Sequence, residues 1–225
     1  MEIDIQKNVL EANDTQADIN RKYFKENNVF VLNMMSSPGS GKTQTLCKTF
    51  EKIIPKIKTG VIVGDICTDN DAQRLRKTGV KASQINTDKF GGDCHLEANL
   101  ILESAKKIKA EKLDLLVVEN IGNLVCPAEF DIGEDARTVI LSVTEGEDKP
   151  VKYPLMFQVA DMAILNKIDL LPYLDFNASL AVDNMRKIHP NLPVFQISAK
   201  TGDGFDPWIE WLKTKVYEKT KCSIK

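Results

Sequence analysis

Eight consecutive residues decide the fold of this chain: Ser36-Ser37-Pro38-Gly39-Ser40-Gly41-Lys42-Thr43. They follow an apolar run, VFVLNMM, and precede TQTLCKTFEKII, whose apolar residues recur at helical spacing. A glycine-rich turn that ends in Lys-Thr between a strand and a helix is the context of the Walker A pattern, although the usual first glycine is Ser36 here. The alternative is an ordinary glycine-rich turn. The flanking segments favour a phosphate-binding loop.

Each residue type in this loop suits a nucleoside triphosphate. Gly39 and Gly41 can adopt backbone angles that other residues avoid, so that successive N–H groups converge on phosphate oxygens at a helix N-terminus. Lys42 supplies positive charge to the β- and γ-phosphates, and the Thr43 hydroxyl binds Mg²⁺. We therefore expect the phosphates to be bound by Gly39, Ser40, Gly41, Lys42, Thr43 and Gln44.

Outward from the loop, short β-branched runs alternate with amphipathic segments. The runs GVIVGD, LDLLVVEN, TVILSV, MAILN and VFQIS lack polar alternation, which indicates strands covered on both faces. The segment DAQRLRKT predicts a helix, and so does the end of the chain, where Asp206 is the expected N-cap and Pro207 the first helical residue. The sequence thus predicts an α/β fold with a doubly wound, mostly parallel sheet and helices on both faces, the P-loop NTPase fold.

Length and composition limit the remaining possibilities. The 225 residues favour one P-loop GTPase domain over residues 29–225, preceded by a helical extension over residues 1–28. Thirty Lys+Arg against 32 Asp+Glu give a formal charge of −2, which argues against nucleic acid or a membrane as partner. No apolar run is long enough to span a bilayer and the polar start does not suit a secretory signal, so we expect a cytoplasmic protein without disulfides.

Two further motifs indicate which base is bound. Asn166-Lys167-Ile168-Asp169 follows the strand MAIL at the carboxyl edge of the expected sheet, where α/β proteins bind ligands. It resembles the NKxD motif of GTPases, whose Asp accepts hydrogen bonds from the guanine ring N–H and exocyclic amine. Ser198-Ala199-Lys200 follows VFQI and resembles the SAK segment on the guanine O6 side. Each motif alone is unspecific, but their order after a phosphate loop predicts GTP, bound by Asn166, Lys167, Asp169, Ser198, Ala199 and Lys200.

Acidic residues at strand ends are candidates for Mg²⁺ and for the attacking water. Glu119 ends LDLLVV, at a position where many GTPases carry Asp-x-x-Gly, and is the Walker B candidate. Asp65 ends GVIVGD, whereas Asp69 is equally well explained as the N-cap of DAQRLRKT. We predict that Lys42, Asp65 and Glu119 are catalytic and that Thr43, Asp65 and Glu119 hold Mg²⁺.

Longer segments resemble one family closely. VVENIGNLVCPAEFDIGE, LSVTEGEDKPVKYP, AILNKIDLLPY and GDICTDNDAQRLRKTG are similar to the HypB family of nickel-insertion GTPases, over nearly everything from Val29 onward. The resemblance implies a GTPase that forms a nucleotide-dependent homodimer and helps load nickel into [NiFe]-hydrogenase. It implies a HypA-type nickel chaperone and the hydrogenase large-subunit precursor as partners. Lys149 and Lys152 match a segment that reaches towards nucleotide in related dimers, or they belong to a solvated charged loop.

Cysteine and histidine form a candidate metal site. Cys94-His95 precedes the helical pattern LEANLILESAKKI, and Cys126 lies seven residues after Glu119. Thiolate and imidazole suit Zn²⁺ and Ni²⁺, but spacing alone is a weak signal because free cysteines are often core residues. CHLEA and NLVCPA resemble the HypB segments that supply metal ligands, which implies that Cys94, His95 and Cys126 bind Ni²⁺ or Zn²⁺. Three ligands leave a tetrahedral site incomplete unless water or a second subunit contributes.

Other functions remain open from the residues alone. A nickel GTPase for urease maturation, UreG, is disfavoured because the Cys-Pro-His arrangement of that family is absent. An ATP-dependent phosphotransferase would use the same loop, but NKID and SAK argue against it. A zinc-binding interaction module without nucleotide is the third alternative. The remaining thiols and imidazole are interpreted as packing, surface or helix-end groups: Cys47, Cys67, Cys222 and His189.

Overall fold

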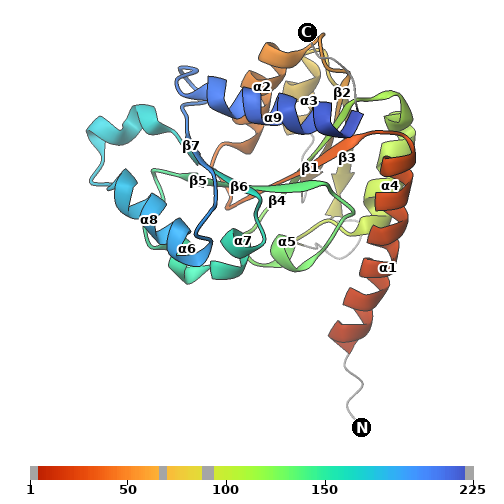
Figure 1. Ribbon diagram of the computed structural model, residues 1–225, viewed down its shortest axis with the longest axis horizontal. Helices are drawn as coiled ribbons and strands as arrows, with labels where there is room; N and C mark the ends of the chain where they lie inside the picture. Colours follow the sequence, from red (N-terminus) through yellow and green to blue (C-terminus); the bar gives the residue numbers. More distant parts are fainter. Residues whose placement is uncertain (1–4, 66–69, 88–93, 221–225) are drawn as a thin grey trace.

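The computed structural model describes residues 5–65, 70–87 and 94–220, and a parallel sheet forms its centre (Figure 1). Within these residues seven strands lie in the order β3-β2-β4-β1-β5-β6-β7, and every neighbouring pair is parallel. The strands are β1 Phe30–Ser36, β2 Thr59–Asp65, β3 Lys81–Asn86, β4 Leu115–Gly122, β5 Ala136–Ser142, β6 Met162–Asn166 and β7 Val194–Gln196. The strand β1, which leads into the phosphate loop, therefore lies between β4 and β5 in the middle of the sheet.

Helices cover both faces of this sheet, as the sequence predicted. In Figure 1, α2, α3 and α9 lie on one side of the sheet, and α5, α6 and α7 lie on the other. The helices are α1 Ile5–Glu26, α2 Lys42–Ile53, α3 Asn70–Arg76, α4 Ala98–Lys107, α5 Cys126–Glu129, α6 Lys149–Lys152, α7 Pro154–Gln158, α8 Ala178–Ile188 and α9 Phe205–Thr220, with short 3₁₀ segments η2 Ala110–Lys112 and η3 Ile168–Tyr173. The doubly wound P-loop NTPase fold is confirmed.

The core lies in layers between the sheet and these helices. Between the sheet and the helices α2 and α9, the layer contains Phe50 of α2 and Trp208 of α9. The layer beneath α1 and α4 contains Phe24 of α1, and the layer beneath α7 and α8 contains Phe157 of α7. The buried Trp208 Nε1 donates a hydrogen bond to Thr49 Oγ1 at 2.9 Å, so its polar atom is satisfied inside the apolar layer. Both faces of the central strands are thus covered, which explains their continuous apolar runs.

Two local features differ from the sequence predictions. The edge strand β3 was not predicted, because its sequence KASQIN is polar and a strand with one neighbour needs no continuous apolar run. The closing helix begins at Phe205, so the prediction of Asp206 as its N-cap is wrong. Gly204 makes the entry turn with a φ of +71°, and a Cβ there would lie 2.0 Å from the Gln196 carbonyl oxygen. Asp206 instead pairs with Lys52 at 3.0 Å.

The segment before the sheet is helical and packs onto the body of the molecule. Helix α1 packs against α4 and contributes Ala17 and Phe24 to the buried residues. The boundary at residue 29 between an extension and a separate domain stays a prediction.

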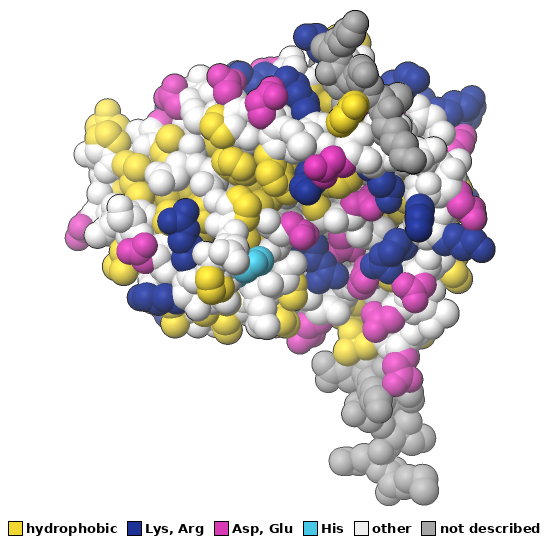
Figure 2. All heavy atoms as spheres, in the orientation of Figure 1, with side chains coloured by type: hydrophobic (Ala, Val, Ile, Leu, Met, Phe, Trp, Pro, Cys, Tyr) yellow, Lys and Arg dark blue, Asp and Glu magenta, His cyan; other side chains and the backbone are white. Residues whose placement is uncertain are grey.

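The described surface carries both signs of charge, and the described helices carry no membrane signature. On the face drawn in Figure 2, basic and acidic side chains are intermixed, in line with the small formal charge of −2. Among the described helices, none combines the length and the apolar character that crossing a bilayer requires.

Candidate functional site: a phosphate loop beside a thiol-imidazole cluster

The phosphate loop has the backbone that its glycines predict. Gly39 and Gly41 have φ values of +74° and +97°, in the region that favours glycine, and α2 starts directly after Gly41. A Cβ on Gly41 would lie 2.5 Å from Asn166 Nδ2, so the close approach of these two segments also requires glycine. The loop therefore presents backbone N–H groups at the N-terminus of a 12-residue helix, an arrangement that attracts anions.

Ser36, the departure from the usual pattern, contacts the loop lysine. Lys42 Nζ donates to Ser36 Oγ at 2.8 Å, and Ser36 Oγ donates to the Ser37 carbonyl at 2.7 Å. Burial lowers the pKa of Lys42, and the nearby carboxylates, Glu119 foremost, oppose that shift. Ser36 thus holds the Lys42 ammonium group against the start of the loop.

Thr43 and Glu119 form a buried pair at the ends of α2 and β4. Thr43 Oγ1 donates to Glu119 Oε1 at 2.6 Å, and Glu119 is 3% exposed. Burial raises the pKa of Glu119 to about 7, an effect that the Thr43 hydrogen bond and the Lys42 charge reduce. Within the described residues Glu119 Oε2 is buried without a hydrogen-bond partner. A hydroxyl and a carboxylate with an unused oxygen fit a hard cation such as Mg²⁺.

A cleft of about 380 Å³ opens in front of this pair. It is lined by Pro38, Gly39, Gly41, Lys42, Thr43, Gln44, Gly64, Asp65, Asp71, Arg74, Glu119, Asn120, Ile121 and Gly122. Asp65, at the end of β2, lies in this lining as the sequence led us to expect, whereas Asp69 falls outside the described residues.

The sequence reasoning missed Arg74, which lies on α3 and faces the cleft. Arg74 Nη2 donates to Gln44 Oε1 at 2.7 Å, and Arg74 pairs with Asp71 at 3.5 Å. One feature of the sequence could have identified Arg74: it lies in the helix predicted after the second strand, one turn after Asp71. The cleft therefore contains two cationic side chains, Lys42 and Arg74, as a polyphosphate requires.

The three nucleotide motifs form one hydrogen-bonded unit. Asn166 Nδ2 donates to the Ser40 carbonyl at 2.9 Å, and Asn166 Oδ1 accepts from the Ala199 N–H at 3.1 Å. Lys167 Nζ donates to the Gly39 carbonyl at 2.7 Å.

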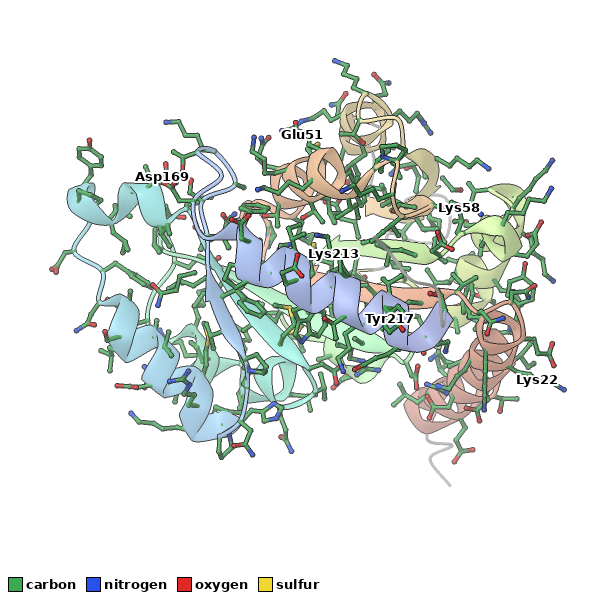
Figure 3. All side chains as sticks on the ribbon, turned by 45° about the horizontal axis from the view of Figure 1, so that its top comes forward. Lys22, Glu51, Lys58, Asp169, Lys213 and Tyr217 are labelled. Atoms are coloured by element: carbon green, nitrogen blue, oxygen red, sulfur yellow. The ribbon has the colours of Figure 1, made fainter. Side chains whose placement is uncertain are left out.

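Ser198 Oγ donates to Asp169 Oδ1 at 2.6 Å, which fixes the carboxylate beside the SAK turn. Figure 3 shows Asp169 near the loop that joins β7 to α9. Lys200 is exposed on the same turn. The residues predicted to read the base thus lie together, joined to the phosphate loop through Asn166.

Cys94, His95 and Cys126 lie together although 32 residues separate the two thiols. One ligand atom from each lies within 4.8 Å of the others, and Cys94 Sγ donates to Cys126 Sγ at 2.8 Å. Burial, and then the neighbouring Cys94, raise the pKa of Cys126 to about 11. The His95 ring stacks on Phe130 with centroids 3.6 Å apart. Two sulfurs and an imidazole are a donor set for Zn²⁺ or Ni²⁺.

The other predicted thiols and charges lie away from this cluster or outside the described residues. Cys47 is partly buried against the core, and His189 is the C-cap of α8. Cys67 and Cys222 are not among the described residues. Lys149 lies 5.2 Å from the Tyr153 ring centroid, and Lys152 pairs with Asp148 at 2.5 Å. Both lysines thus lie on α6 and contact the residues that cap it.

A Walker A loop at the carboxyl edge of a parallel sheet, with a buried Thr-Glu pair behind it, defines a P-loop nucleotide-binding protein. A sequence model described as "CobW/HypB/UreG, nucleotide-binding domain" matches residues 30–196. The hydrogenase maturation factor HypB of Rhizobium leguminosarum bv. viciae is 47% identical over 211 residues, which cover 94% of this chain and 70% of that protein.

Two solved structures are similar along almost their whole length. HypB from Helicobacter pylori in complex with nickel has a TM-score of 0.86 and 39% identity, covering 94% of this chain and 98% of that one. HypB from Archaeoglobus fulgidus has a TM-score of 0.85 and 37% identity, covering 92% of this chain and 99% of that one. The chain therefore belongs to the CobW/HypB/UreG family and, within it, to the HypB proteins.

Proposed function

We propose that this chain is a GTP-hydrolysing metallochaperone that assists nickel insertion into [NiFe]-hydrogenase. One observation carries the proposal: a triad of Cys94, His95 and Cys126 lies on the segments that flank a P-loop nucleotide site. Cys126 begins α5 four residues after the end of β4, the strand that carries Glu119. The similar proteins named above are hydrogenase maturation factors, and one similar structure holds nickel.

Guanine selection rests on Asp169. A carboxylate with two acceptor oxygens matches the ring N–H and the exocyclic amine of guanine, whereas adenine presents an acceptor at the corresponding ring nitrogen. The Ser198 hydrogen bond holds the carboxylate in place, so little conformational freedom is lost when the base binds. Asn166 links this site to the phosphate loop, which sets the distance between base and phosphates.

Phosphate binding and Mg²⁺ binding rest on the cleft in front of the Thr43-Glu119 pair. Lys42 and the loop amides hold the β- and γ-phosphates, and Thr43, Asp65 and Glu119 are the residues that would hold Mg²⁺. When bound, this ion neutralises charge that develops on the phosphoryl oxygens. Glu119 must release its proton to become a ligand, and its pKa of about 7 permits this near neutral pH.

Hydrolysis requires a positioned water and neutralisation of phosphoryl charge. Asp65, which lines the cleft at the end of β2, accepts a hydrogen bond from the water that attacks the γ-phosphorus, and the bond to the β-phosphate oxygen breaks to release GDP. Arg74 supplies positive charge, although its guanidinium group is already bound by an ion pair with Asp71 and a hydrogen bond to Gln44. We expect slow turnover in the isolated protein, which suits a switch.

Nickel is the cargo in this scheme. Three protein ligands leave room for a ligand from a second protomer, so a nucleotide-dependent homodimer completes the site and separates after hydrolysis. A HypA-type nickel chaperone is the proposed donor and the hydrogenase large-subunit precursor the acceptor.

Two measurements on the purified protein test this function. GTP is expected to displace a fluorescent guanine nucleotide at far lower concentration than ATP; equal potency would contradict the assignment of the base. Native mass spectrometry of the protein titrated with Ni²⁺, with and without GTPγS, is expected to show bound metal and a dimer. Cys94→Ala and Cys126→Ala should lose the metal, whereas Cys47→Ala, a thiol against the core, should retain it. Nickel retention by both ligand variants would refute the site.

A further inference from the structure

Helix α1 lies against both chain segments that carry the candidate metal ligands. One segment runs from Cys94 to Ala98, where α4 begins, and the other runs from Cys126 to Ile132. Two asparagines of α1 point into the body of the molecule: Asn13 is 7% exposed and Asn20 is fully buried. Lys22 lies about half a helical turn from Asn20, on the opposite face of α1, and its side chain projects outward in Figure 3.

The two asparagine side chains join these segments. Asn13 Oδ1 accepts from the Ala98 N–H at 3.0 Å, and Asn13 Nδ2 donates to the Asp131 carbonyl at 2.7 Å. Asn20 Nδ2 donates to the Ala98 carbonyl at 2.6 Å and to the Ile132 carbonyl at 3.0 Å. Each side chain thus bonds to both segments, and both bond to Ala98.

The backbone around this junction is shaped to accept α1. Gly133 has a φ of +83°, and a Cβ there would lie 2.6 Å from the Ala17 carbonyl oxygen and 2.9 Å from Arg21 N. Arg21 Nη2 donates to Asp131 Oδ2 at 2.6 Å, and Asp131 Oδ1 accepts from the Gly133 N–H at 2.7 Å. The second segment therefore approaches the helix backbone directly.

Short lengths of chain connect these bonds to the ligand atoms. Ala98 follows His95 by three residues, and the intervening Leu96 is fully buried. Asp131 follows Phe130, whose ring stacks on the His95 imidazole at 3.6 Å. A relative shift of the two segments would separate the ligand atoms, which now lie within 4.8 Å of one another.

We propose that Asn13 and Asn20 are positioning residues for the metal site: they hold the Cys94-His95 segment and the Cys126 segment at the separation that lets one ion bind to both. Neither side chain is a ligand. Both act through the backbone of Ala98, Asp131 and Ile132, as outer residues that orient metal ligands do. The inference rests on the proposed metal site and adds to it the residues that assemble it.

The test compares Asn13→Ala and Asn20→Ala with two controls, one on α1 and one in the turn directly after it. Asn27→Ala removes a side-chain bond to the Tyr23 carbonyl that touches neither segment, and Phe24→Leu weakens the packing of α1 without touching these bonds. Ni²⁺ affinity is measured by competition with a chromophoric chelator. In the metal-free protein, alkylation rates of Cys94 and Cys126 are measured by peptide mass mapping. Guanine nucleotide affinity reports the integrity of the rest of the fold.

We expect Asn13→Ala and Asn20→Ala to weaken Ni²⁺ binding by about tenfold or more and to raise the alkylation rates, with nucleotide affinity within about twofold of the parent. Both controls should keep parental Ni²⁺ affinity. Parental Ni²⁺ affinity in the two asparagine variants overturns the inference, and so does an equal loss in Phe24→Leu.

If the alanine variants do not fold, Asn13→Asp carries the test, because it retains size and the acceptor for Ala98 while losing the donor to Asp131. Parental Ni²⁺ affinity in Asn13→Asp would then overturn the inference. Cys126→Ala distinguishes failure of the proposed metal site from failure of the positioning role. If Cys126→Ala retains nickel, the metal site itself is refuted. If Cys126→Ala loses nickel while the asparagine variants keep parental Ni²⁺ affinity, only the positioning role is refuted.

Discussion

Replacing Asn166 by alanine is expected to destabilise the protein well beyond the loss of one polar side chain. Asn166 is 1% exposed and joins two segments that are remote in sequence. Its amide nitrogen donates to the Ser40 carbonyl at 2.9 Å, and its amide oxygen accepts from the Ala199 N–H at 3.1 Å. Alanine provides neither group, so both backbone atoms lose a buried partner.

The size of the effect follows from the two orphaned groups. A buried donor or acceptor left without its partner costs about 1–3 kcal/mol, so the two groups together should lower the free energy of unfolding by about 2–6 kcal/mol. For a protein of this length, 1 kcal/mol corresponds to about 2–4 °C in melting temperature, which predicts a decrease of about 4–24 °C.

Guanidinium unfolding and calorimetry of the nucleotide-free protein measure this effect. Asn191→Ala is the matched control, because Asn191 is exposed on the turn before β7 and its loss should change the free energy of unfolding by less than about 0.5 kcal/mol. A free-energy change for Asn166→Ala no larger than that of the control would refute the idea that this side chain ties the base-reading motifs to the phosphate loop.

Three further predictions concern single residues around the site. The folded-state pKa of Glu119, about 7, lies above its ordinary value of 4.5, so the folded protein holds a proton that the unfolded chain has lost, and stability falls as pH rises between these values. Glu119→Gln should remove this fall and raise the free energy of unfolding of the metal-free protein at pH 8 by on the order of 3 kcal/mol; equal pH profiles for parent and variant would contradict the buried proton. Gly204→Ala should lower the free energy of unfolding by about 2–4 kcal/mol in guanidinium unfolding, because its Cβ would meet the Gln196 carbonyl. Gly79 also has a positive φ, of +88°, but a Cβ there would meet no other atom, so Gly79→Ala should lower the free energy of unfolding by only about 1 kcal/mol. Equal losses in Gly204→Ala and Gly79→Ala would show that the contact with the Gln196 carbonyl is relieved by a small backbone shift. Arg74→Ala should slow single-turnover GTP hydrolysis by roughly tenfold or more, while the exposed Arg76→Ala leaves it unchanged; an unaltered rate in Arg74→Ala removes the charge role proposed for it.

The sequence predicted the fold because its central strands are buried on both faces and its phosphate loop sits between a strand and a helix. The runs around Val117 and Ile164 are continuous and apolar for that reason. The edge strand β3 has one neighbour and polar residues, so hydrophobic pattern alone does not reveal it. The start of α9 was placed two residues too late, because the Gly204 turn and not the side chain of Asp206 determines where the helix begins.

The site was predicted less completely, for physical reasons that differ between residues. The order of the motifs in the sequence indicated that Asp169 and Ser198 belong to one site, and in the structure Ser198 Oγ lies 2.6 Å from Asp169 Oδ1. The proximity of Cys94 and Cys126 depends on the tertiary fold, so their spacing in sequence does not determine it. Asn13 and Asn20 look like solvated residues of a polar helix, and only the packing of α1 buries them.

The central claim is that Asp169 selects guanine for the triphosphate held at Lys42. Asp169→Asn replaces one acceptor oxygen by an amide donor, which no longer matches the two donors of guanine but does match the 2-oxo group of xanthine. The direct measurement is the dissociation constant of GTP and of xanthosine triphosphate for the parent and for Asp169→Asn. The account predicts that the parent prefers GTP and that the variant prefers xanthosine triphosphate. An unchanged preference for GTP in the variant would contradict it.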